Sequence, residues 1–401
     1  MRTRAFIAVL GLVSLVLAGC GDDKKKSNTE AQGETKTSTT SDGSLQKLGA
    51  GEGAVNVIAW AGYVENGSND PKVDWITGFE KESGCKVNAK VANTSDEMVT
   101  LMKTGQYDGV SASGDATLRL INAGDVAPVN VDLIPNYADV FSGLKDKPHN
   151  TVNGKHYGIP HGRGANLLMW RTDKVKPAPT SWDVVWNDKS PYKGKVTAYD
   201  SPIYIADAAL YLKAHKPELK IDNVYELDDA QFNASVDLLK KQRTVVGEYW
   251  SEYAKSQASF TQGNSVVGTT WQVIANLLST SKPPVPVQTI LPSEGSTGWS
   301  DTWMISSKAA HPNCMYLFMN HIISPQANAA VAEYFGEAPA NSKSCALTAD
   351  KEHCKTFHAD DEAYFAKVAY WNTPVKECGD TRAATCKDYS DWVTAWTAIK
   401  G

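Results

Sequence analysis

Several features common in enzymes and nucleic-acid-binding proteins are absent from this sequence. It has no G-x-S-x-G elbow, no Walker P-loop and no H-E-x-x-H pair, so none of these motifs supports a hydrolase, a nucleotide-binding enzyme or a metalloprotease. An excess of positive charge is also absent, since 40 Lys and Arg stand against 45 Asp and Glu, and the pI is about 5.9. The negative balance of charge speaks against nucleic acid as a partner. Missing motifs do not exclude an enzyme, but nothing in the residues suggests one, and we expect neither an enzyme nor a cofactor. A secreted hydrolase on an α/β scaffold, which would need an activated nucleophile, is the alternative from another class.

The sequence also lacks an apolar run long enough to span a bilayer, and its most apolar segment lies near the N-terminus. Arg2 and Arg4 precede the apolar segment 5–17, which is too short to span a bilayer as a mature helix, and Leu-Ala-Gly-Cys follows at residues 17–20. This order predicts a lipoprotein signal peptide at residues 1–19 and lipidation of Cys20. An ordinary signal peptide with an incidental cysteine is the alternative. Residues 20–53, which hold few apolar side chains, are predicted to be the lipidated cysteine and a disordered tether.

The cysteines also depend on this export prediction. The sequence has 7 cysteines, and those after Cys20 would lie in an oxidising compartment at the outer face of the bacterial cytoplasmic membrane, where pairing is the default. Two pairs are close enough in sequence to close short loops, Cys345 with Cys354 and Cys378 with Cys386. Cys85 and Cys314 remain as the third pair. A zinc site at Cys354, with His353 and His358 beside it, is the alternative, but no C-x-x-C pair supports it. We predict no metal.

Short apolar runs alternate with amphipathic stretches through the rest of the chain. Strands are predicted at 55–60, 85–92 and 107–113, and helices at 74–84 and 96–105. This alternation indicates an α/β fold with a parallel sheet, and ligands of such sheets bind at the carboxyl ends of the strands. Trp60, Ser113 and Asp115 lie at those ends.

Two stretches are predicted to cross between lobes, at 156–170 and 295–307, and a second alternating region lies between them. It includes the helical patterns 205–214 and 228–242. The second crossing carries Trp299, Asp301 and Trp303 in a loop of Gly, Ser and Thr, and an acid between two indoles loses hydration unless a ligand or another polar group replaces it.

Several phrases of the chain together resemble one family. These are IAWAGYV, FEKESGCKV, TSWDVVWNDKSPYKGKV, GTTW, the W-x-D of Trp299 and Asp301, and GEAPANS. The chain resembles the solute-binding proteins of bacterial ABC importers, and among them the spermidine/putrescine-binding (polyamine) group. The resemblance implies a periplasmic-binding-protein fold with two α/β lobes, hinge strands and a cleft between the lobes. It suggests a first lobe at 54–160 plus 300–348 and a second at 161–299 plus 349–401. It also places Cys85 and Cys314 in the first lobe.

The resemblance implies that the protein captures a polyamine in the cleft and delivers it to an ABC permease, as a monomer. The implied ligand-binding residues are Trp60, Tyr63, Ser113, Asp115, Arg163, Asp200, Trp271, Trp299, Asp301, Glu337 and Asn372. In this arrangement Asp301 pairs with an alkylammonium group while the indoles cover its carbon chain. Alternatively, Trp299 packs between the lobes and Asp301 caps a turn. Trp303 is predicted to be a packing residue.

Departures from the family pattern affect the expected charge of the site. Ile203 stands where a second acid is expected, and Asp115 and Glu337 stand where the family has aromatic residues. Arg163 would repel a polyamine unless it neutralises Asp115 or Glu337, or points to solvent. If Arg163 binds a ligand carboxylate instead, the ligand is a zwitterion such as an ω-amino acid. We expect the four acids Asp115, Asp200, Asp301 and Glu337 to outweigh the one guanidinium and to favour a polyamine.

Overall fold

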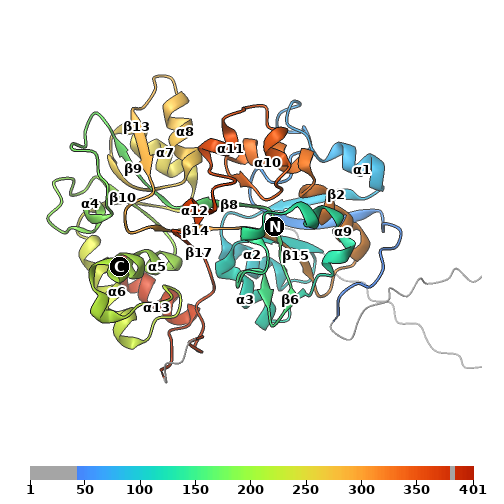
Figure 1. Cartoon of the computed structure of the whole chain (residues 1–401), viewed down its shortest axis with the longest axis horizontal. Coiled ribbons are helices and arrows are strands. Elements are labelled where there is room, and N and C mark those ends of the chain that lie inside the picture. Colours follow the sequence, from blue (N-terminus) through green and yellow to red (C-terminus); the bar gives the residue numbers. More distant parts are fainter. Residues whose placement is uncertain (1–42, 380–383) are drawn as a thin grey trace, which may run out of the picture. The chain divides into compact units, whose positions relative to one another are not determined.

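The computed structural model describes residues 43–379 and 384–401 (Figure 1). The predicted signal peptide, Cys20 and most of the predicted tether lie outside these residues. In the described part of the chain, no helix combines the length and the apolar character needed to cross a bilayer.

The first lobe is built on a sheet with the strand order β2-β1-β3-β15-β4 and with β7 paired to β15. Strands β1, β2 and β3 are parallel, whereas β15 runs antiparallel to β3 and joins the sheet from far along the chain. Its strands are β1 (Ala54–Ala59), β2 (Lys86–Val91), β3 (Gly109–Ala112), β4 (Val126–Ala127), β7 (Ile159–Pro160) and β15 (Thr302–Ser306). Its helices are α1 (Thr77–Ser83), α2 (Ser95–Met102), α3 (Gly114–Asn122), α9 (Pro312–Ile322) and α10 (Pro325–Phe335). The predicted strands and helices of this region are confirmed to within a few residues.

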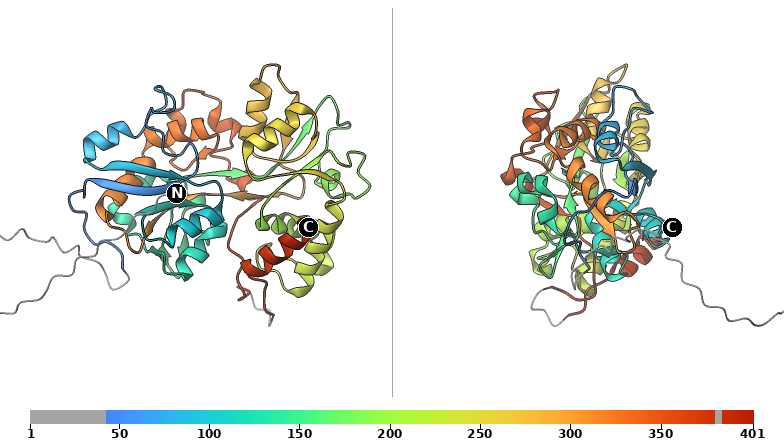
Figure 2. Two further views of the ribbon diagram at one scale, coloured as in Figure 1. Left: turned by 180° about the vertical axis from the view of Figure 1, so that it is seen from behind. Right: turned by 90° about the vertical axis from the view of Figure 1, so that its right-hand side faces the viewer.

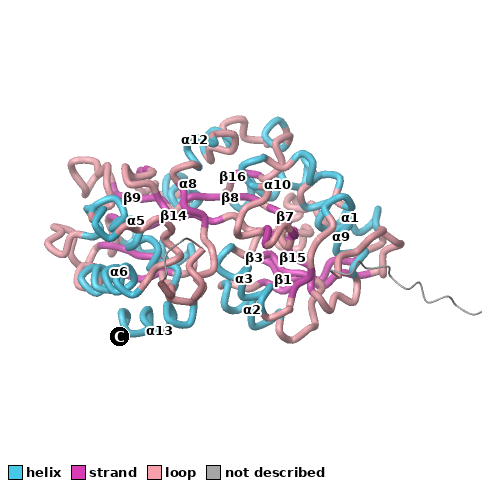
Figure 3. The backbone as a smooth tube through the Cα atoms, turned by 60° about the horizontal axis from the view of Figure 1, so that its bottom comes forward, coloured by secondary structure: helices cyan, strands magenta, loops and turns pink. Residues whose placement is uncertain are grey.

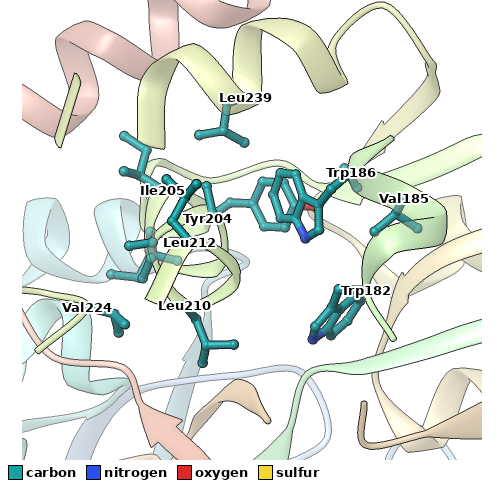
Figure 4. Close-up of a cluster of buried hydrophobic side chains, with 14 of the residues drawn as sticks. Trp182, Val185, Trp186, Tyr204, Ile205, Leu210, Leu212, Val224 and Leu239 are labelled. Carbon is teal, nitrogen blue, oxygen red and sulfur yellow. The ribbon is translucent and has the colours of Figure 1, made fainter. Parts of the chain in front are cut away.

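The second lobe is built on a sheet with the strand order β11-β10-β12-β9-β13. Its strands are β9 (Leu167–Arg171), β10 (Val196–Tyr199), β11 (Val246–Trp250), β12 (Val267–Thr270) and β13 (Val287–Ile290). Its helices are α4 (Asp183–Trp186), α5 (Ile205–His215), α6 (Asp229–Gln242), α7 (Tyr253–Gln262), α8 (Gln272–Thr280) and α13 (Tyr389–Lys400). The C-terminal α13, red in Figure 2, packs against α6. The core between the sheet and these helices includes Trp182, Trp186 and Tyr204, with the rings of Trp186 and Tyr204 stacked at 5.6 Å (Figure 4).

A third sheet, which we call the crossing sheet, connects the two lobes along the chain. Its order is β16-β8-β14-β17, from β8 (Gly162–Ala165), β14 (Ser296–Trp299), β16 (Ala338–Pro339) and β17 (Val368–Tyr370). β8 runs on into β9 of the second lobe, and β14 is followed by β15 of the first (Figure 3). Helices α11 (His353–Thr356) and α12 (Glu362–Phe365) follow β16, and β5 (Thr151–Val152) pairs with β6 (Lys155–His156). Short 3-10 turns lie at Val131–Leu133, Pro135–Asp139, Ser142–Leu144, Pro202–Tyr204, Pro217–Leu219 and Ser344–Ala346. The two predicted crossings are thereby confirmed.

The ends of several helices follow from local sequence. Gly84 ends α1 in the left-handed conformation, with φ 70°, and its N–H bonds the carbonyl of Glu80. Thr94 caps α2 by accepting a hydrogen bond from the N–H of Glu97, and Asp228 and Gln231 form a capping box at α6. The glycine stop predicted for the first helix is therefore confirmed.

All three predicted cysteine pairs are disulfides in the structure: Cys85–Cys314, Cys345–Cys354 and Cys378–Cys386. Cys354 is thus not available as a thiolate, so the zinc alternative for His353 and His358 is wrong. Another group of possible metal ligands, Asp183, His215 and Glu294, has donor atoms within 4.8 Å of one another. Here His215 Nε2 lies 3.1 Å from Glu294 Oε1, which an ordinary hydrogen bond explains.

The last residues of the predicted tether differ from the expectation. Leu45 is buried in the first-lobe core, and its carbonyl accepts a hydrogen bond from Asn130. Glu52 accepts hydrogen bonds from the N–H groups of Asn313 and Cys314 at the start of α9. Residues 43–53 therefore pack despite their few apolar side chains, because Leu45 is buried and the carboxylate of Glu52 bonds the start of α9.

Candidate functional site

Four of the predicted ligand-binding residues meet at the junction of the first lobe and the crossing sheet. Asp301 lies between β14 and β15, and Ser113 follows β3. Tyr63 donates its hydroxyl proton to Asp301 Oδ2 over 2.7 Å, and Ser113 Oγ donates to Asp301 Oδ1 over 2.5 Å. Glu337 Oε2 lies 3.1 Å from the same Tyr63 hydroxyl. All four side chains are buried, and Asp301 is 3% exposed. The structure therefore brings together Tyr63, Ser113, Asp301 and Glu337.

The hydroxyl of Tyr63 decides how many charges this group carries. Tyr63 has one proton and can donate it to only one of the two carboxyl groups, so the other must itself hold a proton to bond with Tyr63. Burial, and then the charge of Asp301, raise the pKa of Glu337 well above its ordinary range. Burial raises the pKa of Asp301 to about 6, although hydrogen bonds from Ser113 and Tyr63 favour its ionised form. Glu337 is therefore the neutral acid and Asp301 the carboxylate at neutral pH.

The neighbouring His161 does not neutralise this carboxylate. The indole N–H of Trp303 donates to His161 Nδ1 over 3.0 Å, so a neutral ring must carry its proton on Nε2, 3.5 Å from Glu337 Oε1. Burial lowers the pKa of His161 to about 3, so the ring is neutral. Across residues 43–379 and 384–401, none of the ion pairs includes Asp301. A buried, ionised carboxylate without a cation is a strong candidate for binding a cationic ligand.

Two glycines of the HGRGAN phrase allow the site residues to lie directly on strand β8. A Cβ at Gly162 would stand 2.3 Å from Glu337 Cδ, and a Cβ at Gly164 would stand 2.6 Å from the ring of Trp299. Any larger residue at either position would displace the carboxyl group or the indole. The glycine-rich composition of this crossing therefore follows from the close approach of two site side chains.

Trp299 and Trp271 both line a small cavity beside the crossing sheet. Its volume is about 20 Å³, which is room for about one water molecule. Phe365 of α12 forms part of its wall, and Trp299 also contacts Phe335 with ring centroids 5.9 Å apart. A ligand larger than water therefore needs the surrounding side chains, or the two lobes, to move apart.

The second lobe contributes a group of aromatic rings around Trp271. Tyr199 lies 5.7 Å from Trp271 and stacks on Trp371 at 5.6 Å, while Trp250 meets Trp271 at 4.9 Å. Neither Tyr199 nor Trp371 was predicted as a site residue. Tyr199 ends strand β10, so the rule that ligands bind at strand ends could have identified it.

The other predicted residues are placed differently. Asp115 accepts a hydrogen bond from Ser95 over 2.9 Å, and burial raises its pKa to about 6, with the charge of Asp301 contributing. The side-chain carbonyl of Asn372 and the indole N–H of Trp60 are buried without a hydrogen-bond partner among the described residues. Asp200 faces α13, where Lys400 bonds it at 2.6 Å and Trp396 at 3.1 Å.

Arg163 has a partner that the sequence did not suggest. Its Nη2 donates to Glu362 Oε1 over 2.7 Å and to the carbonyl of Ala359 over 2.8 Å, and its guanidinium lies 3.8 Å from the ring centre of Phe365. The side chain is fully buried. The expectations that Arg163 pairs with Asp115 or Glu337, or points to solvent, are therefore wrong. Trp303 is a packing residue, as predicted, since it is fully buried and its ring meets Phe318 at 4.9 Å.

Comparison with known proteins identifies the family. The family model described as "Bacterial extracellular solute-binding protein" matches residues 74–362, which is well over half of the chain. The chain belongs to this family. A spermidine/putrescine-binding periplasmic protein of Escherichia coli is 24% identical over 321 residues, covering 79% of this chain and 85% of the relative. A putrescine/agmatine-binding protein of Pseudomonas aeruginosa is 22% identical over 322 residues, covering 75% and 82%.

Solved structures agree on the fold. The spermidine/putrescine ABC transporter substrate-binding protein of Streptococcus pneumoniae matches with a TM-score of 0.67 at 18% identity, covering 86% of this chain and 97% of that one. The structure of a GABA receptor matches with a TM-score of 0.64 at 17% identity, covering 87% and 98%. These likenesses confirm the predicted two-lobe α/β fold of a solute-binding protein.

Proposed function

We propose that this protein is an extracytoplasmic receptor that captures a polyamine, of the putrescine or spermidine type, and delivers it to an ABC permease. The observation that carries the proposal is the buried carboxyl group of Asp301, which forms no ion pair with any residue in 43–379 and 384–401. Its pKa of about 6 leaves it mainly ionised at neutral pH. An alkylammonium group would supply the missing charge, and its carbon chain would lie against Trp299 and Trp271. The names of the relatives from Escherichia coli and Pseudomonas aeruginosa support the same class of ligand.

The protein would act by binding alone and would perform no reaction. Ligand bound between the lobes favours the closed arrangement, and the crossing strands β8 and β14 are the segments about which the lobes would move. Lipidation at Cys20 would hold a monomeric receptor at the outer face of the cytoplasmic membrane, next to its permease. We retain the predicted lobe boundaries, 54–160 plus 300–348 and 161–299 plus 349–401, as part of this proposal.

The alternative ligand, an ω-amino acid, requires a guanidinium that can bind its carboxylate. Both Nη atoms of Arg163 are already bonded, to Glu362, Tyr370 and the carbonyl of Ala359, and only its Nε–H lacks a partner among the described residues. An incoming carboxylate that binds the guanidinium through two hydrogen bonds would therefore have to replace one of these partners. The likeness to a GABA receptor structure concerns the fold and does not change this balance. A polyamine requires no such exchange.

Two ligands with the same four-carbon chain test the proposal directly. 1,4-Diaminobutane and 4-aminobutyrate differ only in one end group, and isothermal titration of the purified protein with each measures the preference. We expect saturable binding of the diamine and none of the amino acid. Binding of 4-aminobutyrate without binding of any diamine or spermidine would overturn the polyamine assignment.

A further inference from the structure

A chain of three hydrogen bonds connects the indole of Trp271 to a buried acid on α5. Trp271 Nε1 donates to Asn166 Oδ1 over 3.0 Å, and Asn166 Nδ2 donates to Thr297 Oγ1 over 2.7 Å. Thr297 Oγ1 in turn donates to Asp207 Oδ1 over 2.9 Å. The chain therefore starts at a ring that lines the small cavity and ends in the first turn of α5.

The direction of each bond in this chain is determined by chemistry. An indole N–H can only donate, so Asn166 must present its oxygen to Trp271 and its NH₂ group to Thr297. The Thr297 hydroxyl accepts from that NH₂ group and has one proton left to donate. An acceptor is needed at the end, and Asp207 provides it.

The middle of the chain is held firmly by backbone contacts. Asn166 joins β8 to β9, and its N–H donates to the carbonyl of Thr297 over 2.9 Å. The hydroxyl of Ser296 donates to the carbonyl of Asn166. Asn166 and Thr297 thus form a fixed bridge between the two strands by which the chain crosses from lobe to lobe.

Asp207 has no other evident reason to be buried. It is 9% exposed, burial raises its pKa to about 7, and none of the ion pairs in the described part of the chain includes it. Burying a carboxyl group costs free energy unless hydrogen bonds compensate it, and Thr297 supplies one such bond. Its bond to Thr297 is the contact that connects it to the site.

We propose that Asp207 is a positioning residue of the amine site, which acts through Thr297 and Asn166 to fix the indole of Trp271 in the orientation that faces the ligand. This inference rests on the proposed function, because it takes Trp271 as a ligand-facing wall. Without the chain, only the ring contacts with Tyr199 and Trp250 hold the Trp271 indole, so its orientation against the amine's carbon chain is less well fixed.

A double-mutant cycle tests whether the effect passes through Trp271. Thr297→Val is nearly isosteric and interrupts the chain, while Trp271→Phe removes the indole N–H and keeps a ring. We expect Thr297→Val to weaken 1,4-diaminobutane binding about tenfold in the wild type, and less than twofold in the Trp271→Phe background. Asp207→Asn, whose side-chain oxygen still accepts from Thr297, should stay within threefold of the wild type, whereas Asp207→Leu should match Thr297→Val. Equal losses in both backgrounds would overturn the proposal.

A second measurement needs no ligand. In protein labelled with 5-fluorotryptophan, the ¹⁹F resonance of Trp271 is the one missing from Trp271→Phe. Thr297→Val and Asp207→Leu should shift or broaden that resonance, and Asp207→Asn should not. An unmoved resonance in folded Thr297→Val would also overturn the proposal. If the wild type bound no amine, the proposed function would fail, while this resonance would still decide whether Asp207 positions Trp271.

Discussion

Replacing Asp301 with asparagine should weaken amine binding and, at the same time, stabilise the ligand-free protein. Asparagine keeps the size of the side chain and an oxygen that can accept the Ser113 hydrogen bond, but removes the buried charge. An ammonium in a nearly dry site loses its counter-charge, which costs about 2–4 kcal/mol of binding, or roughly 30- to 1000-fold in affinity. This range applies because Asp301 is 3% exposed and forms no ion pair within the described part of the chain.

The stability effect has the opposite sign. The pKa of Asp301 is about 6 in the folded protein, against an ordinary value of 3.8, so the folded state holds a proton that the unfolded chain has already released. Stability is therefore lost as pH rises from 3.8 toward 6, and the cost at neutral pH is up to about 3 kcal/mol. A neutral asparagine avoids this cost, so the melting temperature of the ligand-free variant should rise at pH 7 and not at pH 4.

Isothermal titration and thermal unfolding of the same preparations measure both effects. Asp108→Asn is the matched control, because Asp108 is 2% exposed and pairs with His311. The control should leave amine affinity within threefold and should lower stability, since it breaks an existing pair. An Asp301→Asn variant that binds diamine within threefold of the wild type would refute the assignment of Asp301 as the ammonium partner.

Three further outcomes follow from the charged residues predicted for the site, and a fourth from the predicted lipid anchor. Diamine affinity should fall about tenfold per unit as pH drops below about 6, because protonation neutralises Asp301; a flat profile by titration between pH 5 and 7 would contradict this. Asp200→Asn should change affinity less than threefold, since Lys400 already neutralises Asp200, and a tenfold loss would show that the acid is released to the ligand. Arg163→Met should lower the melting temperature but keep diamine affinity, whereas loss of all amine binding would place the guanidinium in the site. Cys20→Ser should move the protein from the membrane fraction to the soluble fraction, and retention would contradict the anchor.

The local features of this chain could be predicted from the sequence because they depend on neighbouring residues. The alternation of strands and amphipathic helices gave the elements of the first lobe, and the W-x-D phrase at Trp299 and Asp301 was correctly placed at a crossing. The ion-pair partners of the predicted site residues could not be predicted, because they lie far away in the chain. Lys400 pairs with Asp200 across a separation of 200 residues, and Glu362 pairs with Arg163 across 199. The pattern of apolar and polar residues carries no information on such distant pairs. The expected site with four acids and one guanidinium is therefore not observed, because Asp200 and Arg163 each have another partner.

The partners of the other three acids explain why Asp301 is the carboxylate that most needs a cationic ligand. Lys400 neutralises Asp200, and Glu337 holds a proton next to Tyr63. Asp115 retains the hydrogen bond of Ser95 and lies within the field of Asp301. Asp301, which follows β14 where the chain passes between the lobes, is therefore the acid whose charge is least compensated.

Several buried polar atoms near the crossing sheet have no hydrogen-bond partner within the described part of the chain. Among the described residues, the Asn372 side-chain carbonyl is one such acceptor, and the indole N–H groups of Trp299 and Trp371 are such donors. Trp299 ends β14, and Trp371 and Asn372 follow β17, so these three groups belong to the crossing sheet or to the residues that directly follow it. Native proteins satisfy nearly all buried polar groups, so water or a ligand is expected to complete them. Water could satisfy the indole groups, but only a cation offsets the buried charge of Asp301. An alkylammonium, which carries N–H donors on a positive nitrogen, supplies the charge that Asp301 lacks.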